Sequence, residues 1–152
     1  MSEIHRLLES SSVLVLEDWA MMMVEPLAPG TCSFLGDDQC RIVEVDIVGP
    51  KNALLSIACQ PKFLLNVARN VLGHDDDEEV PDEVLCDALK ELANVVAGNF
   101  VTELYGKDDA YRLLGFRISE DEPRNVCDAF GEYAVSVFGD DEPVLITFTE
   151  RD

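Results

Sequence analysis

The sequence predicts an α+β fold in which pseudo-duplicated αβββ units share one mostly antiparallel sheet, with helices packed on one face. Two observations lead to this prediction. The expected elements run helix and three strands, a connecting helix, then helix and three strands again, which is the order of an internal repeat. The repeat covers roughly 9–59 and 81–150, and the connecting helix covers 61–73. Because 47% of the 152 residues are hydrophobic, the chain can form one core, and we expect a single domain over 1–152.

The first half opens with a helix expected from about residue 9 to residue 25, ended by Pro26 and the turn sequence APG. Extended segments are then expected at 31–36, 39–49 and 52–59. The segment CRIVEVDIV alternates in part and is rich in β-branched residues, and GPKN suits a hairpin turn. Pro61 is well placed for the first turn of the connecting helix, which ends at Gly73.

The second half follows the acidic stretch HDDDEE, which we expect to be a solvated loop. A long helix is expected from about Pro81 to Gly106. Extended segments then follow at 111–119, 129–139 and 142–150, and Gly139-Asp140-Asp141 predicts a tight turn between the last two.

The net charge of −20 excludes two classes of partner. Nucleic-acid binding needs a basic face that neutralises phosphates, and eleven Lys and Arg spread along the chain do not supply one. An anionic membrane surface is excluded for the same reason. No apolar run is long enough to span a bilayer, and MSEIHRLLE lacks the features of a signal peptide, so we expect a cytoplasmic protein.

The five cysteines are odd in number, scattered, and contain no CxxC pair. Most lie in apolar surroundings such as SIACQ and EVLCDAL. We therefore expect reduced, mostly buried thiols rather than disulfides or a zinc site, which again favours the cytosol.

The long helix separates into an apolar and a polar face at roughly 100° per residue. The apolar stripe consists of Leu85, Leu89, Leu92, Val96 and Phe100. The opposite ridge consists of Asp87, Glu91, Asn94 and Gly98. Asn and Gly in a helix interior together cost roughly 1–2 kcal/mol relative to Ala, and neither packs into the apolar stripe. The ridge therefore indicates a surface that must admit another molecule closely.

The spacing Asp87-x3-Glu91-x2-Asn94-x3-Gly98 resembles the signature of the CheC/CheX/FliY-type chemotaxis phosphatases. This resemblance implies an enzyme that removes the aspartyl phosphate from a CheY-like receiver domain. Asn94 would then position the attacking water, and Glu91 would pair with the active-site Lys of the receiver. Gly98 would permit close approach, and Asp87 would support the pair. The resemblance also implies no cofactor of its own, Mg²⁺ supplied by the phosphorylated partner, and a possible homodimer.

The first helix provides a comparison for this motif. When Glu17 is aligned with Glu91, the position of Asn94 is taken by Ala20, and Val13 and Val24 take the flanking positions. We therefore expect a degenerate second site at Glu17 and one active site per chain, which resembles the CheX-like branch most closely.

Two alternatives stay open. The family often has a Pro some twenty residues after the Asn, whereas LLGFRIS has none. Together with the strong negative charge, this keeps open a non-catalytic CheX-like module that binds a receiver or a flagellar switch component. His74 and the acidic residues at 75–79 are a second alternative, a site for a hard cation, although negative charge before a helix N-terminus explains them as well. We expect no metal site.

Overall fold

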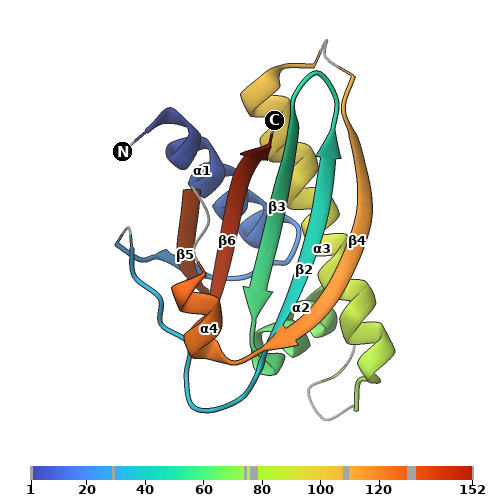
Figure 1. Ribbon diagram of the computed structural model, residues 1–152. Coiled ribbons are helices and arrows are strands. Elements are labelled where there is room, and N and C mark those ends of the chain that lie inside the picture. The colour runs from blue at the N-terminus through green and yellow to red at the C-terminus, as the bar shows by residue number, and fades with distance from the viewer. Residues whose placement is uncertain are drawn as a thin grey trace.

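A computed structural model describes residues 2–28, 30–73, 75, 79–107, 110–129 and 133–151 (Figure 1). The first half contains α1 (Glu3–Asp18), β1 (Val24–Pro26), β2 (Cys40–Val48) and β3 (Asn52–Cys59). The connecting helix is α2 (Pro61–Leu72). The second half contains α3 (Asp82–Tyr105), β4 (Arg112–Asp121), α4 (Pro123–Asp128), β5 (Tyr133–Gly139) and β6 (Glu142–Arg151).

The six strands form one sheet in the order β1-β5-β6-β3-β2-β4, and every neighbouring pair is antiparallel. The long helices α1, α2 and α3 all lie on one face of this sheet (Figure 1). The predicted α+β fold is thereby confirmed. The last strands of the two halves, β3 and β6, pair at the centre, and the first strand of each half pairs with the middle strand of the other half. Because the halves exchange their first strands, the sheet is a single unit.

The core lies between the three helices and the sheet, where alternate strand residues point toward the helices. In β2 these are Val43, Val45 and Ile47, which are all fully buried. Their neighbours on β3 include Leu55 and Ile57. The predicted hairpin turn at GPKN joins these two strands. The turn after Gly139 also forms, with positive φ at both Asp140 and Asp141, as a two-residue hairpin requires.

The first predicted helix is wrong at both ends. It begins at Glu3 rather than near residue 9. It ends at Asp18 rather than near residue 25, and the chain then turns through Met21, which has φ of +56°. The Met23 amide donates to Asp140 Oδ1 at 2.9 Å, and the Asp140 amide donates to the Met23 carbonyl at 2.9 Å. These bonds tie the segment to the β5–β6 turn, so that β1 forms at the sheet edge. The strand predicted at 31–36 is absent, since β1 occupies that edge and residues 31–39 are irregular.

The short helix α4 was not predicted, and it lies on the sheet face opposite the long helices (Figure 1). There Val126 packs with Cys40, Ala58 and Leu145 in a second, smaller apolar cluster. A helix of six residues is too short for its periodicity to be recognised from sequence.

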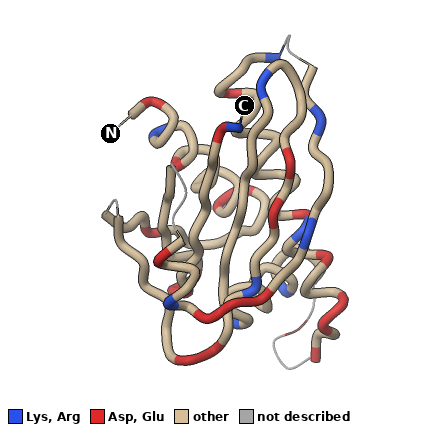
Figure 2. The backbone as a smooth tube through the Cα atoms, in the orientation of Figure 1, with Lys and Arg blue, Asp and Glu red and all other residues tan. Residues whose placement is uncertain are grey.

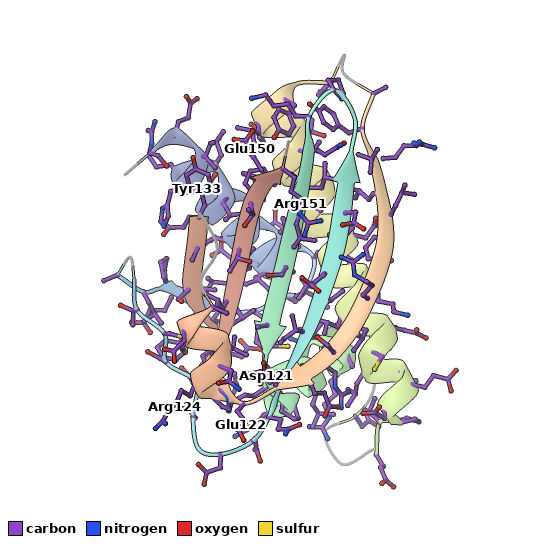
Figure 3. All side chains as sticks on the ribbon, viewed as in Figure 1. Asp121, Glu122, Arg124, Tyr133, Glu150 and Arg151 are labelled. Atoms are coloured by element: carbon purple, nitrogen blue, oxygen red, sulfur yellow. A yellow bond between two sulfur atoms is a disulfide. The ribbon has the colours of Figure 1, made fainter. Side chains whose placement is uncertain are left out.

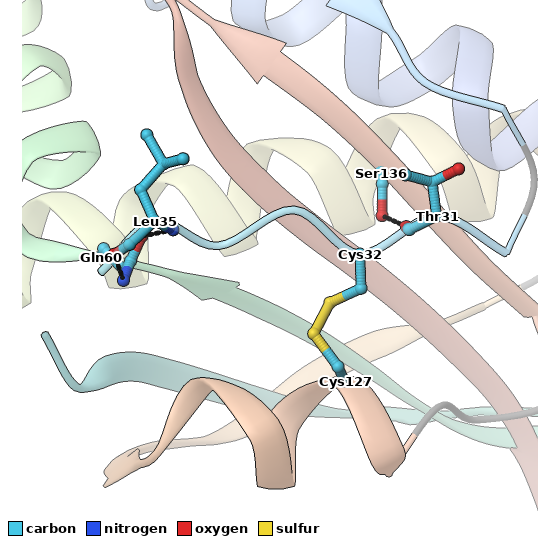
Figure 4. The surroundings of a disulfide bond; sticks show 6 residues. All are labelled: Thr31, Cys32, Leu35, Gln60, Cys127 and Ser136. Carbon is cyan, nitrogen blue, oxygen red and sulfur yellow. Dashed lines mark hydrogen bonds between the residues drawn. A yellow bond between two sulfur atoms is a disulfide. The ribbon is translucent and has the colours of Figure 1, made fainter. Parts of the chain in front are cut away.

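The expectation that all cysteines are reduced is also wrong. Cys32 and Cys127 form a disulfide that joins the segment before β2 to α4 (Figure 4). Nearby, the Gln60 side chain donates to the Leu35 carbonyl at 2.6 Å and accepts from the Leu35 amide at 2.9 Å. The two cysteines are 95 residues apart in sequence, and only the fold brings them together.

Acidic residues are spread over all parts of the fold, and Lys and Arg residues lie among them (Figure 2). The open sheet face carries the ends of many polar side chains (Figure 3). Arg151 lies at one end of that face, and Asp121, Glu122 and Arg124 lie at the other. Within the described residues, no helix combines the length and apolar character needed to cross a bilayer.

Candidate functional site

Helix α3 presents the predicted polar ridge to solvent. Asp87, Glu91 and Asn94 are exposed, whereas Leu89, Leu92, Val96 and Phe100 on the other side are buried at 1% exposure or less. Leu85, the first residue of the predicted stripe, is only partly buried and lies near the N-terminal end of the helix. The ridge therefore stands on a rigid helix whose opposite side is fixed in the core.

Gly98 leaves the C-terminal end of the ridge open. A Cβ at this position would meet no atom within 4 Å outside the adjacent helix backbone. The glycine is therefore not needed for packing within this chain. Its destabilising effect in mid-helix, about 1 kcal/mol relative to Ala, is offset by no internal contact. This geometry fits a surface that must come close to another molecule.

The ridge borders an open depression of about 510 Å³. Its lining residues are Asp87, Lys90, Glu91, Asn94 and Phe116. Four of these come from consecutive turns of α3, and the fifth comes from strand β4. The structure thus brings together three of the four predicted motif residues, with Gly98 one turn further along α3. Sequence reasoning missed Phe116, although Gly115 before it, inside an expected strand, is a signal for a bulge.

Phe116 reaches the depression through a β-bulge. Glu44 of β2 pairs with Arg117, and Asp46 pairs with Leu114, so Gly115 and Phe116 together lie opposite Val45. Gly115 has φ of +66°, the left-handed conformation that this type of bulge requires. The Phe116 ring packs partly against the main core, which places it on the helix side of the sheet.

A charged pair holds this bulge from the other side of the sheet. Arg117 Nη1 donates to the Gly115 carbonyl at 3.0 Å and to Asp46 Oδ2 at 2.6 Å. The hydrogen bond from Arg117 lowers the pKa of the Asp46 carboxyl, and the same bond raises the pKa of Arg117. A Cβ at Gly115 would lie 2.9 Å from both Arg117 Nη1 and Asp46 Oδ2. A side chain at this position would therefore displace the ends of the pair, and the positive φ independently favours glycine.

The N-terminal part of α3 is anchored by Arg41 of β2. Arg41 Nη1 lies 2.7 Å from Asp82 Oδ1, and Arg41 Nη2 lies 3.4 Å from Glu120 Oε1 on β4. Burial opposes the charge of Arg41, but the hydrogen bond and charge of Asp82 outweigh burial, so the pKa of Arg41 is raised. The bridge joins α3, β2 and β4, the elements that carry or support the depression.

The first helix has no comparable ridge. Glu17 is exposed, but α1 ends one residue later, and Ala20 is fully buried beyond the helix end. Glu17 instead borders a largely apolar groove of about 530 Å³, together with Val13, Leu14 and Pro26. Val24 lies in β1 rather than on the helix. The spacing compared from the sequence is therefore not helical past Asp18, and Glu17 has no amide partner at that position.

The alternative of a metal site at 74–79 falls mostly outside the described residues, since His74 and 76–78 are not described. Across the parts of the chain that the structure describes, no three His, Cys, Asp or Glu side chains are grouped as ligands of a metal ion would be.

The exchanged-strand sheet, with the Glu-x2-Asn ridge on its long helix, resembles the fold of the CheC, CheX and FliY chemotaxis proteins. The chain resembles the CheX branch of these proteins: a sequence model of the family described as chemotaxis phosphatase CheX matches residues 41–114, which include the ridge. The resemblance predicted from the motif is thereby confirmed. A comparison with curated proteins gives no match.

Solved structures of chemotaxis proteins share this fold. CheX from Desulfovibrio desulfuricans is 17% identical and superposes with a TM-score of 0.73, covering 99% of this chain and 100% of that one. The CheX-CheY-BeF3-Mg²⁺ complex from Borrelia burgdorferi gives 24% identity and a TM-score of 0.68, covering 97% of each chain. FliY from Thermotoga maritima gives 13% identity and a TM-score of 0.58, covering 95% of this chain and 86% of that one.

Proposed function

We propose that this protein is a phosphatase that hydrolyses the aspartyl phosphate of a CheY-like response-regulator receiver domain. The observation that carries the proposal is the exposed pair Glu91 and Asn94, side by side on a rigid helix at an open depression. The family described as chemotaxis phosphatase CheX matches this region. A CheX protein of similar fold forms a complex with CheY, BeF3 and Mg²⁺, which supports a receiver domain as the partner.

The chemistry is an in-line displacement. A water oxygen bonds to phosphorus while the bond from phosphorus to the aspartyl oxygen breaks, so the products are inorganic phosphate and a free carboxylate. Asn94 suits the positioning of this water, because its amide accepts one hydrogen bond and donates two. Phosphoryl transfer depends mainly on positioning and charge stabilisation. The receiver supplies the Mg²⁺ and the phosphate-binding Lys.

Glu91 has a different role in this proposal. Its exposed carboxylate pairs with the Lys of the receiver and thereby sets how deeply Asn94 inserts. The contact is a charge-assisted hydrogen bond, which strengthens once the depression is covered and water is excluded. Asp87, one turn earlier, supports the orientation of the pair, and Gly98 allows the receiver to approach the helix.

A phosphate-release time course with purified phospho-receivers of the same genome tests this proposal. Asn94→Ala is expected to reduce the accelerated dephosphorylation by about 100-fold, because the water loses its ordering group. Glu91→Ala is expected to reduce it by weakening the docking. Asn99→Ala is the matched control, since Asn99 is an exposed amide of α3 outside the depression whose side chain donates to the Val95 carbonyl. Wild-type activity in Asn94→Ala would contradict the mechanism.

The second candidate function is a receiver-binding module without catalysis. The specific observation in its favour is the acidity of the depression, where Asp87 and Glu91 face only one cation, Lys90, among the lining residues. Because receiver active sites are acidic, this surface slows their encounter. A complex that persists while the phosphate is retained would favour the module. Pairing of two chains and a cytoplasmic location remain predictions in either case.

A further inference from the structure

The depression beside Glu91 and Asn94 has one apolar wall. Phe116 is its single aromatic lining residue, and the other four are charged or amide side chains. The ring is half-buried and packs partly against the main core, so it is fixed on one side and accessible on the other. An aromatic side chain surrounded by a polar rim is the usual composition at the centre of a protein–protein contact.

The position of this ring is not a by-product of regular strand geometry. It depends on the bulge at Gly115, where the positive φ favours glycine and the ends of the Arg117 and Asp46 side chains approach closely. The bulge inserts Phe116 opposite Val45, a position that regular pairing would fill with one residue. Edge strands often carry bulges where a side chain must be redirected, and β4 is the edge strand next to α3.

The negative charge of the chain explains why an apolar contact is useful at this site. The chain carries a net charge of −20, and the depression itself contains two carboxylates and one ammonium group. Long-range charge therefore does not attract an acidic receiver surface. Burial of an aromatic side chain supplies attraction that is independent of charge and salt, and it also removes water from the Glu91 contact.

We propose that Phe116 is an apolar anchor that docks the receiver domain addressed by Glu91 and Asn94, and that the Arg117–Asp46 pair positions this anchor from the opposite face of the sheet. This inference rests on the proposed receiver partner but not on catalysis. It makes Phe116 a specificity residue, since a receiver must present an apolar surface beside its phosphorylated aspartate. Arg117 is a positioning residue, because it acts through the Gly115 bulge.

The test is a titration of the full chain with receiver domains loaded with Mg²⁺ and BeF3, which cannot be hydrolysed. Phe116→Ala is expected to raise the Kd by about 10-fold or more, whereas Phe116→Leu keeps it within about 3-fold, as for an aromatic anchor replaced by another apolar side chain. Ile118→Ala is the matched control. Ile118 is a half-buried apolar residue of the same strand that does not line the depression.

Arg117→Gln tests the positioning of the anchor. It keeps the residue polar but weakens the hydrogen bonds from residue 117 to Asp46 and the Gly115 carbonyl. The Kd is therefore expected to rise by about 3-fold or more, although Phe116 itself is unchanged. Melting temperatures of all four variants separate loss of fold from loss of docking. A structural role alone would make Phe116→Ala and Ile118→Ala lose stability and affinity together.

The outcomes separate this inference from the proposed function. If Phe116→Ala and Ile118→Ala bind the receiver with equal affinity, the anchor is refuted even where Asn94→Ala abolishes dephosphorylation. If the wild type binds the receiver and releases no phosphate, catalysis is refuted while the anchor is still supported by a weaker Phe116→Ala complex. If no receiver binds the wild type, both are refuted.

Discussion

Arg117 and Asp46 face each other across β4 and β2, with Arg117 Nη1 2.6 Å from Asp46 Oδ2 and Arg117 Nη2 3.3 Å from Asp46 Oδ1. Arg151 from the end of β6 lies 3.7 Å from the same carboxylate. The Asp46 carboxylate on the open sheet face therefore binds arginines from β4 and β6. It also fixes the bulge at Gly115, and the next residue, Phe116, borders the candidate site on the helix face. A polar cluster on one side of the sheet and the site on the other are parts of one arrangement.

This relationship predicts a difference in stability that depends on pH. The pKa of Asp46 is lowered in the folded state, so the pair stabilises the fold above the unfolded pKa of about 3.9 and loses this effect as the pH falls through the folded pKa. Asp46→Asn is expected to be less stable than the wild type at pH 7, by up to about 1 kcal/mol for a pair this exposed. The two proteins are expected to converge as the pH falls below the lowered folded pKa of Asp46. Urea unfolding from pH 7 to pH 2.5 measures this difference, and a constant difference over that range would contradict the assignment.

Gly98 predicts opposite effects of two substitutions at one position. Gly98→Ala is expected to stabilise the protein by about 1 kcal/mol, because Ala is the better helix former and its Cβ has free space. Gly98→Leu is expected to keep the fold but to slow receiver dephosphorylation by about 10-fold or more, because its side chain occupies the approach to the ridge. Thermal melts and phosphate release measure the two effects. Glu103→Leu places the same side chain at another exposed position of α3 and is expected to change neither.

The first helix predicts that one site acts per chain. Glu17→Ala is expected to leave the dephosphorylation rate unchanged, because Glu17 has no amide partner and Ala20 is buried past the helix end. Glu91→Ala replaces the same residue type on α3 and is expected to lower the rate. The pair of variants is measured in the same phosphate-release assay. Equal losses from both substitutions would show that α1 contributes a second site.

Much of the fold could be predicted because local and global signals agree. Helix α3 has a full apolar stripe, and its polar ridge stands out because Asn94 and Gly98 disfavour a helix interior. The strands β2 and β3 have β-branched runs and a clear turn between them, and β6 follows a two-residue turn of the predicted kind. Apart from Asn94 and Gly98, the residues of these segments generally prefer the sheet or helix in which they lie.

The parts of the fold and the site that the sequence did not predict depend on contacts between residues that are distant in sequence. The first helix is apolar enough to continue beyond Asp18, but the bonds between Met23 and Asp140 draw that segment to the sheet edge. Phe116 lies 22 residues after Asn94 on another element, so no helix pattern includes both. The exchange of the first strands between the halves likewise has no local signature, because strand order is set by the whole sheet.

The disulfide between Cys32 and Cys127 predicts that stability depends on reductant. It closes a loop of 95 residues, for which removal of a native disulfide typically costs about 2–5 kcal/mol. Exchange with the two buried thiols is disfavoured, because burial and then the charge of Asp121 raise the pKa of Cys40 to about 11, and burial also raises the pKa of Cys59. Addition of a dithiol reductant is therefore expected to lower the melting temperature of the wild type.

Cys127→Ser is expected to melt at the temperature of the reduced wild type and to lose its response to reductant. Cys86→Ser is the matched control, since Cys86 is a free, half-buried thiol, and its melting temperature is expected to respond to reductant as the wild type does. The dephosphorylation rate is expected to stay unchanged in Cys127→Ser, because α4 lies on the sheet face opposite α3 (Figure 1). A melting temperature that is identical with and without reductant would show that the bond does not stabilise the folded chain.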